Sequence, residues 1–510
     1  MSTKANGFDP TPSWHRRVSL TVLPSGERTP ADAPLGVPVA ASGGFPAVLP
    51  VGRQDLTAAG FAGKPGQTLV LPRQDGPPLV AVGAGEPGGG GADALRDAAA
   101  AYARAAGTAE QLALSLTELS GVAPESAGQA AVEGMLLARY RFGVLKREPE
   151  PPVTAVTLVC APDAVAAVER GARRGLAYAQ AASLARDLAN SPPSLLTAER
   201  LGATAAELGA DCGLSVEVYD RDALLELGCG GLLGVNAGSA DEPRMIKLRY
   251  RPAAADAPRL TLVGKGIMYD SGGISLKPAD AVHATMKNDM SGAAAILAAM
   301  SQLRGLDCPV AVTGYLMCTD NMPSGTAVKL GDVLTMRGGT TVEVVNADAE
   351  GRLVMADALV LATEEPVDAI VDIATLTGAC LRALGPQVAG VFGNDQGLVD
   401  QVRAAATRVD EPVWQLPLAH RYRAELDSDV ADIKNMGGAN GQAIHAALFL
   451  EEFVAGTPWA HVDIAGTAQN DTPRTWFPQG CTGFGARLLL DLALAFTRPQ
   501  PDPLAAGRRS

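Results

Sequence analysis

Histidine and paired cysteine are scarce in this 510-residue chain, and both absences limit its metal chemistry. It has five histidines and no HExxH motif, so a zinc site with two histidines on one helix is excluded and any His-rich site is hard to assemble. The seven cysteines stand singly, without a CxxC pair. This pattern is typical of reduced, mostly buried thiols in a cytosolic protein.

Long apolar runs and a surplus of basic residues are also missing. The chain contains no uncharged apolar stretch of about 18 residues, so no membrane-spanning helix is expected. The N-terminal stretch has no apolar core of a secretory signal. The formal net charge of −13 argues against a broad basic surface for nucleic acid. We therefore expect a cytoplasmic protein that does not contact a membrane. Binding to nucleic acid is disfavoured and would need a local basic patch.

Glycine-rich motifs for nucleotides are present only in imperfect form. Gly83, Gly85 and Gly88 match G-x-G-x-x-G after a strand, but Pro87 and the run of four glycines that starts at Gly88 delay the helix whose N-terminus would hold a pyrophosphate. The segment "VGKGIMYDSGG" has Tyr269 where the third glycine would fall, and it lacks the spacing of a phosphate-binding loop. Neither segment predicts a nucleotide site.

The remaining pattern predicts an α/β protein with a smaller N-terminal α/β domain and a larger C-terminal one. Ranges 18–24, 47–51, 68–72, 79–85 and 155–163 resemble strands, and 91–107 resembles a helix. Further on, near-continuous apolar strands alternate with helices, which favours a mainly parallel central sheet covered by helices. The predicted divisions are an N-terminal domain (1–165), a connecting helix (166–192), a larger C-terminal domain (193–498) and a flexible tail (499–510).

Three segments of the second domain carry polar residues where apolar strands end. Ligands of parallel sheets bind at the carboxyl ends of strands, so these residues are candidates for one site. They are Lys265, Asp270 and Lys277 in "VGKGIMYDSGGISLKP", Asp289 in "MKNDMSGAA", and Asp348, Glu350 and Arg352 in "NADAEGRL".

Four carboxylates brought together would repel one another unless a counter-charge is present. A pair of divalent ions resolves that repulsion, and carboxylate oxygens suit Mg, Mn or Zn. On an extended segment, Asp348 and Glu350 would point to one side and could bind the same ions. Taken singly, each acid has another explanation. Asp289 could cap the following helix, Asp270 could sit in a turn, and the third segment could form a structural ion-pair cluster. The joint occurrence favours metal.

These motifs together resemble the leucyl aminopeptidase (cytosol aminopeptidase, peptidase M17) family. "NMPSGTAVKLGDV", "DIATLTGA", "ADIKN" and "WAHVDIAGTA" extend the match in the same order, over about residues 170–495. Ala347 departs from the family's usual threonine. The first ~160 residues match only in their α/β character and placement.

The resemblance implies a metal-dependent aminopeptidase that binds two divalent ions per subunit, manganese or zinc, or magnesium. Asp270 and Glu350 would bridge the ions, Asp348 would complete one, and Lys265 and Asp289 the other. Lys265 would have to bind as the neutral amine.

The resemblance also assigns catalysis to Lys277, which would stabilise the developing oxyanion, and to Arg352, which would hold bicarbonate as the general base. It places peptide substrate, preferably with a Leu-like first residue, near a further set of residues. These are Lys277, Met286, Asn346, Thr375, Leu376 and Gly378. It further implies a homohexamer.

Two readings besides a general aminopeptidase remain open. Gln442 and His445 replace the family's usual glycine and threonine beside the substrate region, which leaves room for a peptidase dedicated to one amino-acyl intermediate of a pathway. Some members of the family also bind DNA and act in regulation, a role that the acidic balance of this chain disfavours.

Overall fold

The computed structural model describes residues 7–117 and 121–500, so the predicted tail lies outside the described residues from position 501 on. The chain forms two compact units. One comprises Thr11–Ser183 and Asn470–Gly480, and the other is built mainly from Leu184–Gln469. The boundary falls within the helix α4 (Val165–Asn190), the long connecting helix that the sequence predicts.

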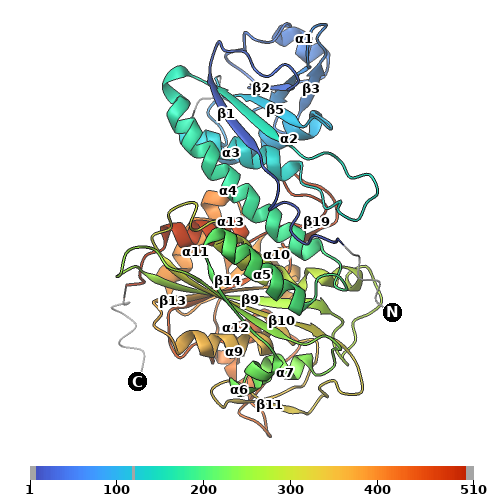
Figure 1. The fold of residues 1–510 in the computed structure, drawn as a ribbon, viewed down its shortest axis with the longest axis vertical. Helices are drawn as coiled ribbons and strands as arrows, with labels where there is room; N and C mark the ends of the chain where they lie inside the picture. Colours follow the sequence, from blue (N-terminus) through green and yellow to red (C-terminus); the bar gives the residue numbers. More distant parts are fainter. Residues whose placement is uncertain (1–6, 118–120, 501–510) are drawn as a thin grey trace. The chain divides into compact units, whose positions relative to one another are not determined.

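The N-terminal unit contains a six-stranded sheet with the order β1-β6-β5-β2-β4-β3, in which only β3 is antiparallel to its neighbour (Figure 1). The strands are β1 (Ser19–Pro24), β2 (Leu35–Val39), β3 (Thr68–Leu71), β4 (Leu79–Gly83), β5 (Gln111–Ser115) and β6 (Ala155–Cys160). The helices are α1 (Arg53–Ala58), α2 (Gly91–Ala105), α3 (Pro124–Ala138) and the 3-10 turn η1 (Pro162–Ala164).

The sequence-based prediction for this unit is confirmed at β1, β3, β4, β6 and α2, and wrong at 47–51, which is a turn. It also missed β2 and β5. Pro38 makes β2 look unsuitable as an interior strand, because proline has no N–H to donate. The structure resolves this conflict, since β5 pairs only with Leu35 and Gly36 of β2. Pro38 therefore has no β5 residue opposite it that would need its N–H. Helix α2 begins at Gly91, the last glycine of the run, as expected.

The second unit contains an eight-stranded sheet with the order β15-β14-β17-β13-β9-β10-β8-β7. Its four central strands, β17, β13, β9 and β10, are parallel. On one side β14 runs antiparallel to β17 and parallel to β15, and on the other β8 runs antiparallel to both β10 and β7. The strands are β7 (Ser215–Tyr219), β8 (Arg244–Tyr250), β9 (Arg259–Asp270), β10 (Ala311–Asn321), β13 (Ala369–Ala374), β14 (Ala389–Gly393), β15 (Val413–Gln415) and β17 (Trp459–Asp463). The predicted mainly parallel sheet is confirmed.

Helices cover both faces of this sheet (Figure 1). On one face lie α5 (Ala198–Cys212), α8 (Ser291–Met300), α11 (Gln396–Val409) and α13 (Ala486–Ala495). On the other lie α7 (Gly230–Asn236), α9 (Gly351–Thr363) and α12 (Gln442–Glu451), around a core that includes Met355, Phe449 and Trp459. The remaining elements are α6 (Arg221–Glu226), α10 (Gly378–Leu384), η2 (His283–Met290), η3 (His420–Leu426), β11 (Val333–Thr335), β12 (Thr341–Glu343), β16 (Ile433–Lys434), β18 (Gln469–Asn470) and β19 (Gly480–Cys481).

Two further expectations can be compared with the structure. All seven cysteines are buried free thiols, as predicted. Within 7–117 and 121–500, no helix combines the length and apolar character that crossing a membrane requires.

Candidate metal centre

The candidate residues converge at the carboxyl ends of the central strands, where strand ends and helix starts meet. Lys265 lies within β9 and Asp270 is its last residue. Asp289 lies near the end of η2, directly before α8, and Glu350 directly precedes α9. One carboxylate oxygen each from Asp270, Asp289 and Glu350 lies within 4.8 Å of the others, and all three residues are buried.

Two lysines pair with these acids. The Nζ of Lys265 lies 2.8 Å from Asp289 Oδ2 and 2.7 Å from Glu350 Oε1, and it also donates to the carbonyl oxygen of Thr375 at 3.0 Å. The Nζ of Lys277 lies 2.7 Å from Asp270 Oδ2 and 2.5 Å from Asp348 Oδ1. Counted as ionised, the four carboxylates exceed the two ammonium groups by two negative charges.

The pKa values of the acids reflect this imbalance. Burial, and next the charge of Asp270, raise the pKa of Glu350 to about 8 against the attraction of Lys265. Burial also raises the pKa of Asp289 to about 6. Burial lowers the pKa of Lys265, but Asp289, Glu350 and Asp270 together raise it above its ordinary value. The cluster therefore attracts further positive charge.

One prediction about the local backbone is wrong. Asp348, Glu350 and Arg352 do not lie on an extended strand, because Glu350 has helical angles (φ −77°, ψ −35°) and Arg352 lies in the first turn of α9. Asp348 lies in a turn, where its N–H donates to Asn346 Oδ1 at 2.8 Å. The turn and helix start direct Asp348 to Lys277 and Glu350 to Lys265, so the two acids have different partners.

Arg352 is buried and only partly paired. Its Nη1 donates to the carbonyl oxygen of Asn435 at 2.8 Å, whereas its Nε has no hydrogen-bond partner among the described residues. Burial lowers the pKa of Arg352 to about 10, although Glu350 and Asp463 oppose the shift. A buried guanidinium with an open N–H donor can hold a small oxyanion.

Two asparagines that the sequence reasoning did not assign hold the cluster in place. Asn321, the last residue of β10, donates through Nδ2 to Asp270 Oδ1 at 2.8 Å and to the carbonyl oxygen of Ala347 at 3.0 Å. Asn435 accepts from the N–H of Val345 at 2.9 Å and donates to the carbonyl oxygen of Asn346 at 2.8 Å. Both stand in the motifs "NMPSGTAVKLGDV" and "ADIKN", which were the available signal.

The predicted substrate residues differ in their contacts with this cluster and in their exposure. Thr375 belongs to it, because its Oγ1 donates to Asp289 Oδ1 at 2.7 Å. Leu376 is half-buried and its N–H donates to Asp463 Oδ1 at 3.3 Å, while Gly378 begins α10 and is exposed. Asn346 supports the turn at Asp348. Met286 is half-buried in η2, three residues before Asp289.

The two unusual residues of α12 differ in environment. His445 is fully buried, with Nε2 at 3.3 Å from Glu425 Oε2, and its ring packs edge-on against Tyr422. Gln442, at the start of the helix, accepts a hydrogen bond from Arg382 Nη2 at 3.4 Å near the surface. His445 therefore contributes to the buried packing at the start of α12, whereas Gln442 contributes a polar contact near the surface.

Residues 183–490 match the catalytic domain of the cytosol aminopeptidase family, peptidase M17, and residues 54–149 match the N-terminal domain of that family. The chain therefore belongs to the cytosol aminopeptidase family, as its motifs predict. Membership supports a peptidase of the hydrolase class.

Individual relatives extend this similarity over most of the chain. A probable cytosol aminopeptidase of Roseiflexus castenholzii is 42% identical over 88% of this chain and 94% of its own length. One from Streptomyces avermitilis is 45% identical over 86% of this chain and 88% of its own length. Among solved structures, the bottromycin maturation enzyme BotP in complex with Mn has a TM-score of 0.84 and 40% identity, covering 91% of this chain and 99% of that one.

Proposed function

We propose that the chain is an aminopeptidase that uses two divalent metal ions to release the N-terminal residue, preferably Leu-like, from peptides. The observation that carries the proposal is the cluster of Asp270, Asp289, Asp348 and Glu350, of which all but Asp348 are buried. Counted as ionised, these four acids exceed the two lysines that pair with them by two negative charges. The Mn complex of BotP and the oxygen-rich donor set support manganese, with zinc and magnesium as alternatives.

Each residue of the cluster has a place in this proposal. Asp270 and Glu350 would bridge the ions, Asp348 would complete one, and Asp289 and Lys265 the other. Bound there, divalent ions supply Lewis acidity, which acidifies water and polarises a carbonyl group. Lys265 has to lose its proton to serve as a ligand, so metal affinity should rise with pH.

Lys277 and Arg352 would act on the reacting groups. The half-buried ammonium of Lys277 keeps its proton, because Asp270 and Asp348 raise its pKa against the opposing effect of burial, and it can donate to an oxyanion that forms during hydrolysis. Arg352 presents its open Nε–H to a small oxyanion, and bicarbonate held there would accept the proton of the attacking water.

The test compares metal content and hydrolysis of leucyl amide in the chelator-treated and metal-loaded protein. We expect turnover only with metal. Glu350→Ala should lose both bound metal and activity, whereas Glu364→Ala, at the exposed far end of α9, should keep both. Retention of metal and turnover by Glu350→Ala, or no turnover by the metal-loaded wild type, would refute the assignment.

A second candidate function is a peptidase dedicated to one intermediate of a biosynthetic pathway. The solved neighbour BotP bears the name of a maturation enzyme, and Gln442 and His445 change the surroundings of the substrate region. Hydrolysis rates across amides of all common first residues separate the two functions. A general enzyme should discriminate among aliphatic residues by only about 1–3 kcal/mol per methylene, whereas a dedicated enzyme should leave nearly all of them uncleaved.

We extend the proposal to a homohexamer in the cytoplasm, in line with the family resemblance. Sedimentation velocity of the purified full chain and fractionation of the producing cells test these two statements.

A further inference from the structure

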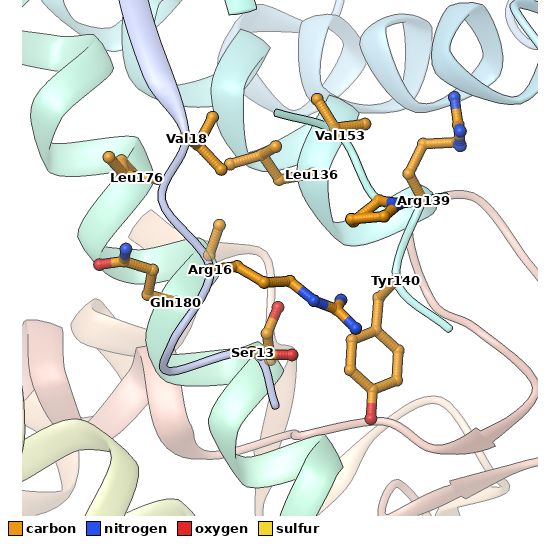
Figure 2. Close-up of a pocket in the computed structure, with 12 residues that line it drawn as sticks. Ser13, Arg16, Val18, Leu136, Arg139, Tyr140, Val153, Leu176 and Gln180 are labelled. Atoms are coloured by element: carbon orange, nitrogen blue, oxygen red, sulfur yellow. The ribbon is translucent and has the colours of Figure 1, made fainter. Parts of the chain in front are cut away.

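A cavity in the N-terminal unit has no role in the proposed function. It is a small cavity of about 60 Å³ with an open mouth. Its walls come from the segment before β1, the end of α3 and the middle of α4, as Figure 2 shows with Arg16, Leu136 and Leu176. All of its lining residues belong to the unit Thr11–Ser183.

The cavity carries positive charge. The half-buried side chain of Arg16 extends across it towards Tyr140 (Figure 2). No hydrogen bond or ion pair joins the guanidinium of Arg16 to any residue that the structure describes. Arg139 forms another part of the wall, where its Nη1 donates to the carbonyl oxygen of Ala109 at 3.0 Å. No acidic side chain lines the cavity. The positive charge of Arg16 therefore favours binding of an anion.

Another arginine, Arg141, lies near Arg139. Burial, and next the charge of Arg141, lower the pKa of Arg139, while Glu150 only partly opposes them. Glu150 is 3.5 Å from Arg141, and both side chains are largely exposed to solvent, which screens the pair. A chain with a formal net charge of −13 thus has a local cationic site beside a cavity.

The rest of the wall is mainly apolar. Its apolar residues are Val18, Leu136, Pro152, Val153, Leu176 and Ala179, and its polar residues are Ser13, Tyr140, Gln180 and Ser183. Small-molecule sites commonly combine such a wall with a few polar groups. Inorganic phosphate would bind Arg16 but would lie against hydrocarbon, whereas an anion with an apolar body matches both parts of the wall.

We propose that this cavity binds a small organic carboxylate with a branched apolar body. The carboxylate pairs with the planar guanidinium of Arg16, whose N–H groups match two carboxylate oxygens, and the body lies against Leu136 and Leu176. The site is separate from the residues assigned to metal and catalysis, so this proposal stands whether or not the chain is an aminopeptidase.

Isothermal titration calorimetry on the full chain tests the proposal with 4-methylpentanoate, its neutral amide and inorganic phosphate. The wild type should bind the carboxylate and bind the amide and phosphate at least about tenfold more weakly. Arg16→Gln should weaken carboxylate binding by at least about tenfold. Arg17→Gln, which changes the adjacent exposed residue outside the cavity, should bind like the wild type.

A melting curve without ligand first establishes that each variant folds. If Arg16→Gln does not fold, Arg16→Lys takes its place, since it keeps the charge but loses the planar pair of donors and should weaken binding by a smaller factor. Equal carboxylate affinity in wild type and Arg16 variants, phosphate binding as strong as carboxylate binding, or no carboxylate binding at millimolar concentration would overturn the proposal.

Discussion

At the scale of single residues, the site gathers four carboxylates and two lysines, most of them buried. Lys265 and Lys277 each contact two carboxylates, and these contacts raise the pKa of both lysines against the opposing effect of burial. Removing one partner of such a group leaves the other buried and unbalanced. The role of each residue can therefore be tested by replacing it while metal content is measured separately.

Lys277 should be needed for turnover but not for metal binding. In Lys277→Met the oxyanion loses a charged donor, which typically costs about 10²–10³-fold in kcat. Bound metal should stay at the wild-type level, because Asp270 and Asp348 remain and lose a competing cation. Lys329→Met, an exposed lysine in the same unit, is the control. A parallel loss of metal would show that Lys277 acts on site assembly instead.

Glu350 should make the chelator-treated protein less stable as pH rises. Its pKa is about 8 in the folded chain against 4.5 without the fold. Between these values the folded state binds the proton and the unfolded chain does not, so stability falls with increasing pH. The melting temperature should therefore drop more steeply from pH 5 to pH 8 in wild type than in Glu350→Gln. Identical slopes would contradict the shifted pKa.

At the scale of secondary-structure elements, close backbone packing sets the position of the cluster. Helix α8 approaches β13 so closely that a Cβ on Gly292 would lie 2.2 Å from the carbonyl oxygen of Ile373. A Cβ on Gly351, at the start of α9, would lie 2.7 Å from the side chain of Lys265. The glycines in "MSGAA" and "AEGRL" thus let two helix starts reach the strand ends.

Gly292→Ala should destabilise the second unit, the catalytic unit, because the added methyl group must displace the backbone of β13. Overpacking of this kind typically costs about 1–3 kcal/mol. Gly325→Ala is the matched control, since a Cβ there meets nothing within 4 Å. Urea denaturation followed by circular dichroism measures both. Equal stability of the two variants would show that α8 can shift without cost.

At the scale of the whole molecule, the two units have separate cores. One hydrophobic core gathers residues such as Ile267, Met355 and Phe449 in the catalytic unit. The N-terminal unit has its own, around residues such as Val82 and Leu158. Each unit can therefore have its own unfolding transition, since cooperativity follows the packed core.

Metal should shift only one of these transitions. A ligand that binds only the folded state increases the free energy of unfolding by RT ln(1 + [L]/Kd). The carboxylate cluster belongs to the catalytic unit alone. Differential scanning calorimetry should therefore show two transitions, of which manganese raises one. A single transition that moves as a whole on adding manganese would show that the units unfold together.

The sequence by itself determined the family, the α/β class, the mainly parallel sheet and the residues that meet at its edge. Apolar periodicity and motif order encode these features locally. Only the tertiary structure revealed that Pro38 lies in a sheet, that Asn470–Gly480 returns to the N-terminal unit, and that Asp348 and Glu350 leave a turn towards different lysines. It also brought Asn321 and Asn435 to the cluster. These features depend on contacts between segments distant in the chain, and such contacts leave no periodic signal in the sequence.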